Sequence, residues 1–203
     1  MPLRITNLFQ TTRRARSITV LLALVAVMTF AGCSKSGGND LHVKSAATGD
    51  KGVAVKSSYT FPVTKTFTDI NQKITTAATY NVYAASYELD AANFAMTLQK
   101  PLTADDQVRV EFSLVGEEGT NDKAALKTGT YSAKADKYMK VESVGLVTRK
   151  GGADSKNWFD RSTLTGEVKL TSVSDDSISG DIDVTAGESS VKGSFTAKIL
   201  KRK

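Results

Sequence analysis

The sequence contains one cysteine, Cys33, and one histidine, His42. A Ser-His-Asp or Cys-His catalytic site needs a histidine base beside its nucleophile, and zinc or copper sites are usually built from several His and Cys ligands. The sequence also lacks a phosphate-binding Gly-rich loop and a dinucleotide-binding fingerprint. We therefore predict no catalytic residues, no metal site and no cofactor, and the thiol of Cys33 is the group with the clearest chemistry.

Cys33 follows a stretch that is typical of a secretory signal. Residues 1–17 carry four arginines and no acidic residue, and residues 18–31 form an apolar run of fourteen positions. A membrane-spanning helix needs about 20 apolar residues, so this run is short for a permanent transmembrane anchor. The small residues Ala31 and Gly32 leave the backbone accessible to a peptidase. We predict cleavage between Gly32 and Cys33.

Phe30-Ala31-Gly32-Cys33 resembles the lipobox of bacterial lipoproteins, although that family prefers Leu at the place of Phe30. The resemblance implies that Cys33 is lipidated, with a thioether link to diacylglycerol, and becomes the new N-terminus. A thiolate is the nucleophile that this chemistry requires, and acyl chains such as palmitate would hold the protein at a membrane. The alternatives are an ordinary secretory signal with an incidental cysteine, or an uncleaved anchor.

The resemblance also predicts where the protein is and what it meets. Removal of residues 1–32 lowers the net charge from +6 to +2, so we expect no nucleic-acid partner. Ser34 is compatible with sorting to the outer membrane, facing the periplasm, in a Gram-negative host. The predicted partners are the membrane itself, through the lipid, and another envelope protein, a glycan or a cell-wall polymer.

Composition divides the rest of the chain into two parts. Residues 33–57 have the Gly, Ser, Ala and Lys content of a flexible tether, and His42 falls within them. Within this stretch, residues 52–55 could pair with the edge of a sheet. Residues 58–203 are predicted to form a single domain, because about 150 residues suffice for one ordinary core.

From residue 58 onward, apolar and polar residues alternate with a period of two. The clearest case is residues 107–114 (QVRVEFSL), which predicts a strand with one dry face and one wet face. Further strands are predicted at the places where similar alternation recurs, namely residues 59–63, 80–89, 93–98 and 138–148. Short strands joined by turns predict an all-β fold, either an antiparallel sandwich or a curved half-barrel.

The pattern apolar-x-Gly-x-apolar-x-apolar occurs three times, with its glycines at Gly166, Gly180 and Gly193. Turn sequences separate the copies, so they predict a three-stranded meander at the end of the domain. If Ile182 pairs with Gly193, then Gly180 lies opposite Phe195. The glycines either curve the sheet, which we favour, or leave space for an apolar ligand. The region is loosely similar to small β-rich lipoprotein domains of unknown function, a similarity that implies no activity.

Aromatic residues are the best candidates for a binding surface. Trp158 and Phe159 follow a turn and could contact a sugar or a partner, although capping the core is the commoner use of such residues. Tyr83 and Tyr87 share one strand face, with Tyr80 on the other, and we favour a core position for that face. A calcium site that uses the Asp-rich turn 175–176 is a weak alternative.

The sequence therefore favours a lipid-anchored cell-envelope protein that acts as a binding or structural interaction module. A carrier of a small apolar ligand, held in a curved β cavity, is the alternative. An envelope enzyme is the least favoured hypothesis, because the histidines and motifs that would support one are missing.

Overall fold

The computed structural model describes residues 39–201. The predicted signal peptide, residues 1–32, and the predicted cleavage site at Gly32–Cys33 lie outside the described residues. The elements in chain order are β1 (Asp40–Ser45), β2 (Gly49–Ala54), β3 (Ser57–Thr68), β4 (Ile74–Ala85), α1 (Phe94–Gln99), β5 (Val108–Val115), β6 (Gly129–Ser132), β7 (Lys140–Lys150), β8 (Ala153–Trp158), β9 (Thr165–Val173), β10 (Ser177–Ala186) and β11 (Ser189–Ile199).

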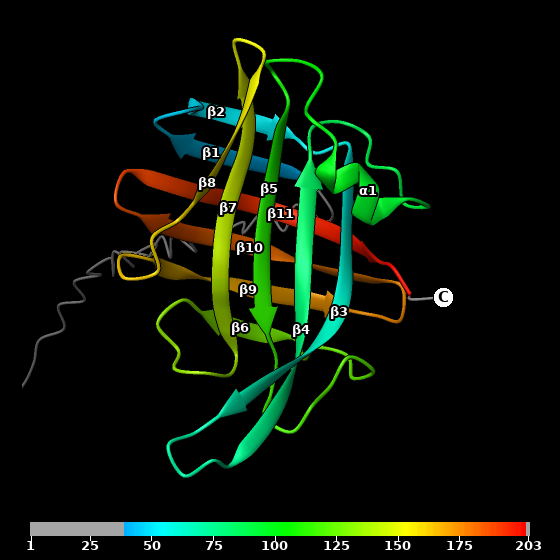
Figure 1. Ribbon diagram of the computed structural model, residues 1–203, viewed down its shortest axis with the longest axis vertical. Helices are drawn as coiled ribbons and strands as arrows, with labels where there is room; N and C mark the ends of the chain where they lie inside the picture. The colour runs from blue at the N-terminus through cyan, green and yellow to red at the C-terminus, as the bar shows by residue number, and fades with distance from the viewer. Residues whose placement is uncertain (1–38, 202–203) are drawn as a thin grey trace, which may run out of the picture. The chain divides into compact units, whose positions relative to one another are not determined.

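Eight of these strands close into a barrel in the order β10-β9-β6-β7-β5-β4-β3-β11, with β11 pairing back onto β10. Figure 1 shows β3, β4, β5 and β7 running along the long axis, and β9, β10 and β11 running across behind them. Most neighbours are antiparallel, but β6 meets β7 and β11 meets β3 through short parallel contacts. The all-β prediction is confirmed. The sheet is a closed mixed barrel, so the antiparallel sandwich or half-barrel is not confirmed.

The interior of the barrel is filled by side chains from both groups of strands. Phe112 of β5 and Phe195 of β11 meet edge to face, with ring centroids 5.0 Å apart. Tyr131 of β6 is fully buried beside them in the same cluster, and its hydroxyl donates to the Lys127 carbonyl at 2.9 Å. Close packing of this kind supplies the main hydrophobic stabilisation of the domain.

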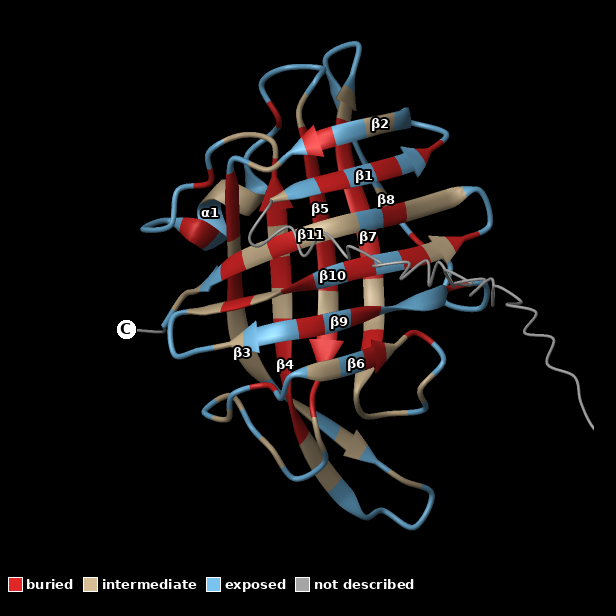
Figure 2. Ribbon diagram, turned by 180° about the vertical axis from the view of Figure 1, so that it is seen from behind, coloured by how far each residue is buried: buried red, intermediate tan, exposed pale blue. Residues whose placement is uncertain are grey.

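Strands β9, β10 and β11 form the predicted three-stranded meander. The register places Ile182 opposite Gly193 and Gly180 opposite Phe195, which is the register considered from the sequence. Figure 2 shows buried and exposed residues alternating along these strands. A Cβ added at Gly180 would overlap the carbonyl oxygen of Lys169 on β9, and one at Gly193 would overlap that of Asp40 on β1. These glycines admit neighbouring backbone and leave no room for a ligand, which supports the curvature interpretation.

Replacement of Gly180 by Ala should therefore destabilise the barrel by about 1–3 kcal/mol, because the β9 backbone must move away from the new methyl group. Gly52→Ala is the matched control, since a Cβ there meets no atom within 4 Å. Urea denaturation of both variants measures the difference. Equal midpoints would show that the approach of β9 to β10 at Gly180 is not a constraint.

Residues 40–54 differ from the predicted tether, because they form β1 and β2. Leu41 pairs opposite Gly193 of β11, and Leu41, Val43 and Val53 are buried in the interior cluster. The Gly and Ser content of this stretch is typical of a linker, but its alternating apolar residues can cover the edge that β11 would otherwise expose. The barrel domain thus begins at β1 rather than at residue 58.

Residues 93–98 also differ from the prediction, because they form most of the short helix α1 instead of a strand. Phe94 and Leu98 are four positions apart and share one face of the helix, while Met96 is 59% exposed. The apolar residues at 94, 96 and 98 fit a period of two, but burial follows the helical spacing. No helix within residues 39–201 is long and apolar enough to cross a membrane.

Among residues 39–201, every residue of the two apolar clusters lies between Leu41 and Leu200. A chain of residues 34–203 therefore keeps all of the described packing, and we choose it for the measurements in solution proposed below.

Candidate functional site

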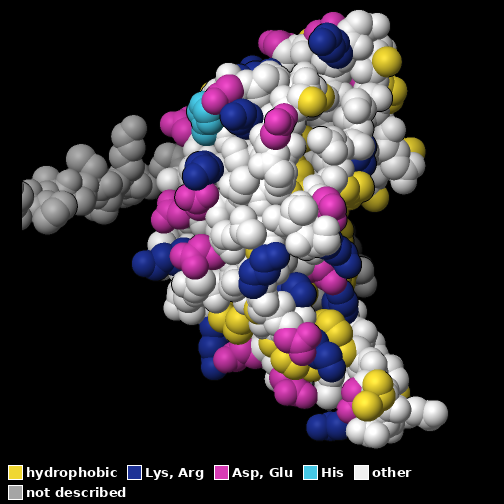
Figure 3. All heavy atoms as spheres, turned by 90° about the vertical axis from the view of Figure 1, so that its left-hand side faces the viewer, with side chains coloured by type: hydrophobic (Ala, Val, Ile, Leu, Met, Phe, Trp, Pro, Cys, Tyr) yellow, Lys and Arg dark blue, Asp and Glu magenta, His cyan; other side chains and the backbone are white. Residues whose placement is uncertain are grey.

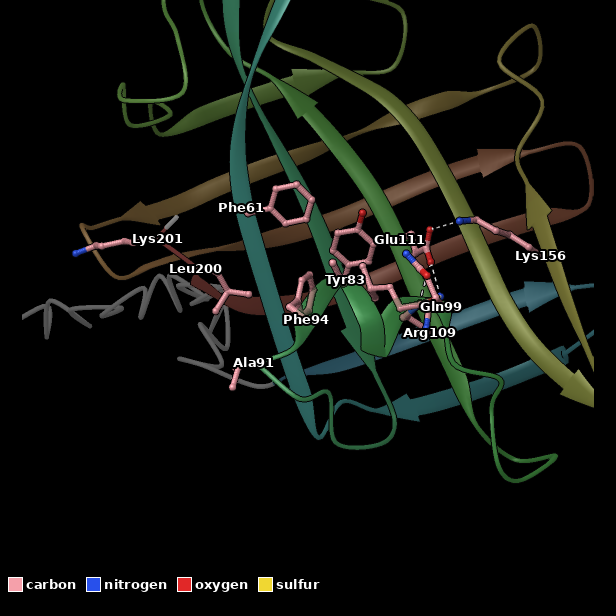
Figure 4. A pocket seen from close by; sticks show the side chains of 13 residues that line it. Phe61, Tyr83, Ala91, Phe94, Gln99, Arg109, Glu111, Lys156, Leu200 and Lys201 are labelled. Carbon is pink, nitrogen blue, oxygen red and sulfur yellow. Dashed lines mark hydrogen bonds and ion pairs between the residues drawn. The ribbon is translucent and has the colours of Figure 1, made fainter. Parts of the chain in front are cut away.

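A groove of about 710 Å³ lies on the outside of the barrel, between α1 and the outer face of the neighbouring strands. Figure 4 shows Arg109, Glu111 and Lys156 on one side of the groove and most of its apolar side chains on the other, where Lys201 also lies beside Leu200. Its volume is in the range of small-molecule sites. The lining side chains come from β3 (Phe61), β4 (Tyr83), β5 (Arg109, Glu111), β8 (Lys156), the α1 segment (Ala91, Ala92, Phe94, Ala95, Leu98, Gln99) and the C-terminal segment (Leu200, Lys201).

The floor of the groove is unusual because β4 and β5 are largely buried on both faces (Figure 2). The alternation in residues 107–114 predicted a wet outer face for Arg109 and Glu111. Instead, these two side chains are only 4% and 6% exposed. The connection between β4 and β5, which contains α1, covers one side of them, and β8 lies on the other.

Arg109 and Glu111 form a buried ion pair with further partners. The Nε and Nη2 atoms of Arg109 each lie 2.9 Å from Oε1 of Glu111. The remaining donors of Arg109 reach the Tyr87 hydroxyl at 2.9 Å and the Leu98 carbonyl at 3.3 Å. The second carboxylate oxygen of Glu111 lies 2.7 Å from Nζ of Lys156, whose side chain is 45% exposed. The three groups together carry one net positive charge, and Lys156 presents it to the groove.

An aromatic cluster forms the apolar wall and attaches α1 to the barrel. Phe94 of α1 packs edge to face on Phe61 and Tyr83, with centroids 6.0 and 5.3 Å away. Phe61 and Tyr83 are stacked at 5.8 Å. Tyr83 and Tyr87 therefore belong to a second cluster outside the barrel, whereas Tyr80 packs in the interior. The strand face that bears Tyr83 and Tyr87 was predicted to be a core face. It is covered, but by α1 on the outside of the barrel and not by the barrel interior.

The hydroxyl of Tyr83 is held in its protonated form. Burial raises the pKa of Tyr83, the Glu111 charge raises it further, and Arg109 acts in the opposite direction. Burial likewise raises the pKa of Tyr87. At neutral pH the Tyr83 hydroxyl is thus a hydrogen-bond donor on the wall of the groove, close to Glu111.

The polar end of the groove is assembled along one row of cross-strand neighbours. Tyr83 pairs with Glu111, Glu111 with Gly145, and Gly145 with Trp158. A Cβ at Gly145 would lie 2.5 Å from Cε3 of Trp158, so the glycine allows the indole ring to lie against the sheet. The indole in turn contacts Lys156, whose Nζ is 4.4 Å from the ring centroid.

The structure separates the two aromatic residues that the sequence singled out. Trp158 is 49% exposed and lies beside the groove through its contact with Lys156. Phe159 is 6% exposed within the interior cluster, and its backbone N–H donates to the Val144 carbonyl at 2.8 Å. Phe159 is therefore a core residue rather than an exposed contact.

In the turn considered for calcium, Asp176 is engaged in a surface pair with Lys201. Asp183, on β10, pairs with Lys192. Within the described part of the chain, no group of three or more His, Cys, Asp or Glu side chains is placed to hold a metal ion. His42 lies on β1 and pairs with Asp50 at 3.0 Å on the surface.

The surface of the barrel around His42 carries intermixed charges of both signs (Figure 3). The face that bears β4 and β5 lies at the right-hand edge of that view, where the outline is hollowed and hydrophobic side chains gather.

Arg109, Glu111 and Lys156 were not singled out by the sequence, because an Arg and a Glu two positions apart on a strand are ordinarily a solvated face. The sequence did offer one indication of this site, namely Tyr83 and Tyr87 on one strand face. In the structure Tyr83 pairs across the strands with Glu111, and Tyr87 accepts a hydrogen bond from Arg109. The chain matches no protein-family model, no curated protein and no solved structure. Its function must therefore be inferred from the chemistry of the chain itself.

Arg109→Met should destabilise the domain by about 3–5 kcal/mol, since it leaves the Glu111 carboxylate buried with half of its partners. The double variant Arg109→Met/Glu111→Leu should recover most of that loss. Lys192→Met removes a surface pair and should change stability by less than about 0.5 kcal/mol. Urea denaturation compares all three, and an unaltered Arg109→Met would contradict the burial described above.

Proposed function

We propose that this chain is a lipid-anchored cell-envelope protein that acts as a binding or structural interaction module rather than as an enzyme. The lipid is attached at Cys33, residues 1–32 are removed, and the outer groove is the binding surface. The observation that carries the binding role is the groove itself, because it combines an apolar aromatic wall with a net positive charge.

The position of the domain along the chain supports the anchoring part of the proposal. Only residues 34–38 separate Cys33 from Asn39, the first described residue, so the chain between them spans at most about 20 Å. The backbone carbonyl of Asn39 accepts from Val55, and its side chain accepts from the backbone of Thr196 at 2.6 Å. A lipid at Cys33 would thus hold the barrel close to the bilayer surface.

The predicted partners follow from this placement. A module held next to the membrane meets envelope proteins, glycans and cell-wall polymers, and in a Gram-negative host Ser34 favours the periplasmic face of the outer membrane. If the protein is instead a carrier, its ligand must bind at a different place from the one predicted. The barrel interior is filled by residues such as Phe112, Tyr131 and Phe195, so a carried ligand would occupy the outer groove instead of a cavity in the sheet.

Cys33→Ser tests the anchor, because serine lacks the thiolate that takes the lipid. In the native host, wild-type protein and the control Ser34→Ala should sediment with membranes and carry a diacylglycerol-modified N-terminus at Cys33. The Cys33→Ser variant should lose that modification. Mass spectrometry of the extracted proteins checks both. Wild-type protein with an unmodified Cys33, or one that keeps its first 32 residues, would refute lipid anchoring.

A photo-reactive amino acid at Gln99, an exposed residue at the groove, tests the binding role in whole cells. The control position is Lys169, an exposed residue of β9 on the other side of the barrel. Cross-linked products should form at position 99 and not at position 169. Equal yields at the two positions, or none at either, would contradict the groove as the binding surface.

A further inference from the structure

We infer that the groove binds an amphiphile with an anionic head and a single apolar chain, such as a fatty-acid carboxylate or an alkyl phosphate monoester. This inference rests on the proposed function, since it names the ligand of the same groove. It follows from the arrangement of charge and apolar surface along the groove and from the position of the groove relative to the start of the domain.

The charged end of the groove is suited to an anion. Arg109 uses its donors on Glu111, Tyr87 and the Leu98 carbonyl, so it fixes Glu111 in place rather than facing a ligand. Lys156 is the partly exposed member of the group, and its ammonium carries the charge that Glu111 leaves uncompensated. An anionic oxygen at this place would pair with Lys156.

The rest of the groove is suited to a hydrocarbon chain. Figure 4 shows Phe61, Phe94 and Leu200 on the side away from Lys156, with Tyr83 between the two ends. Lys201 also lies at this end, but its ammonium pairs with Asp176 at 3.2 Å. These side chains belong to the cluster that attaches α1 to the barrel. A chain placed along them would be removed from water, which is the main driving force for binding of an apolar group. A small inorganic anion would leave this surface exposed.

The apolar end of the groove is also the end nearer to the start of the domain. Leu200 donates its N–H to the Thr60 carbonyl, and Thr196, four residues earlier, binds the side chain of Asn39. A protein anchored through Cys33 therefore brings this end of the groove toward the bilayer. Amphiphiles that leave or enter a membrane are the ligands that such an orientation favours.

Dodecanoate and dodecyl phosphate, each below its micelle-forming concentration, are the probes for calorimetric titration of residues 34–203. Both should bind in the groove, and the tighter of the two identifies a carboxylate or a phosphate head as the natural one. Binding should also change the fluorescence of Trp158, the only tryptophan, because its ring contacts Lys156. Hexanoate and inorganic phosphate should each bind at least tenfold more weakly than the corresponding twelve-carbon probe.

Two pairs of variants locate the ligand. Lys156→Gln should weaken dodecanoate binding about tenfold, which is typical of a lost charge-assisted hydrogen bond, while Lys192→Gln should not. Ala95→Glu places a carboxylate on the apolar side of the groove and should weaken binding at least tenfold. Met96→Glu adds the same charge at the next, exposed residue of α1, which does not line the groove, and should have little effect.

Several results would overturn the inference. These are the absence of binding heat, equal binding of dodecyltrimethylammonium, equal binding of hexanoate and dodecanoate, and Lys156→Gln binding like wild type. None of them bears on the lipid at Cys33, which the fractionation experiment tests separately. A cross-link from position 99 to a protein alone would likewise contradict the amphiphile while leaving the interaction module in place.

Discussion

The close approach of neighbouring backbones over glycines is the constraint on which the barrel depends. The carbonyl of Lys169 occupies the place of a side chain at Gly180, and the carbonyl of Asp40 does the same at Gly193. Strands that come together in this way can coil tightly enough for β11 to reach both β10 and β3. Once the sheet has closed, large side chains fill its interior. A binding surface must then be built on the outside.

The outer face of β4 and β5 supplies that surface because the chain between these strands folds back over it. Phe94 of α1 packs on Tyr83, and Leu98 offers its carbonyl to Arg109. The cost of burying Glu111 is offset by two cationic partners, only one of which is itself buried. Buried charge on the outside of a barrel contributes little to stability compared with a well-packed apolar face. Its presence here is the local departure from ordinary packing that often accompanies a functional site.

The proposed anchor and the proposed ligand site reinforce each other physically. The short stretch between Cys33 and Asn39 limits how far a lipidated protein can stand from its membrane, and the start of β1 lies near the apolar end of the groove. Confinement near a bilayer raises the local concentration of any membrane-derived amphiphile, so even a modest affinity would suffice for occupancy. A partner protein in the envelope would benefit from the same confinement.

The sequence by itself determined those strands whose apolar and polar residues alternate, because this pattern depends only on neighbouring residues. It predicted the all-β class and the meander, and it included the register that places Gly180 opposite Phe195, because these depend on the period of the side chains and on nearby turns. It assigned residues 40–51 to a tether, and it assigned Arg109 and Glu111 to a wet face. Those outcomes depend on contacts with segments far along the chain, namely β11 for β1, and α1 and β8 for the ion pair. Only the tertiary structure decided them, since burial is a property of what lies opposite a residue and not of the residue itself.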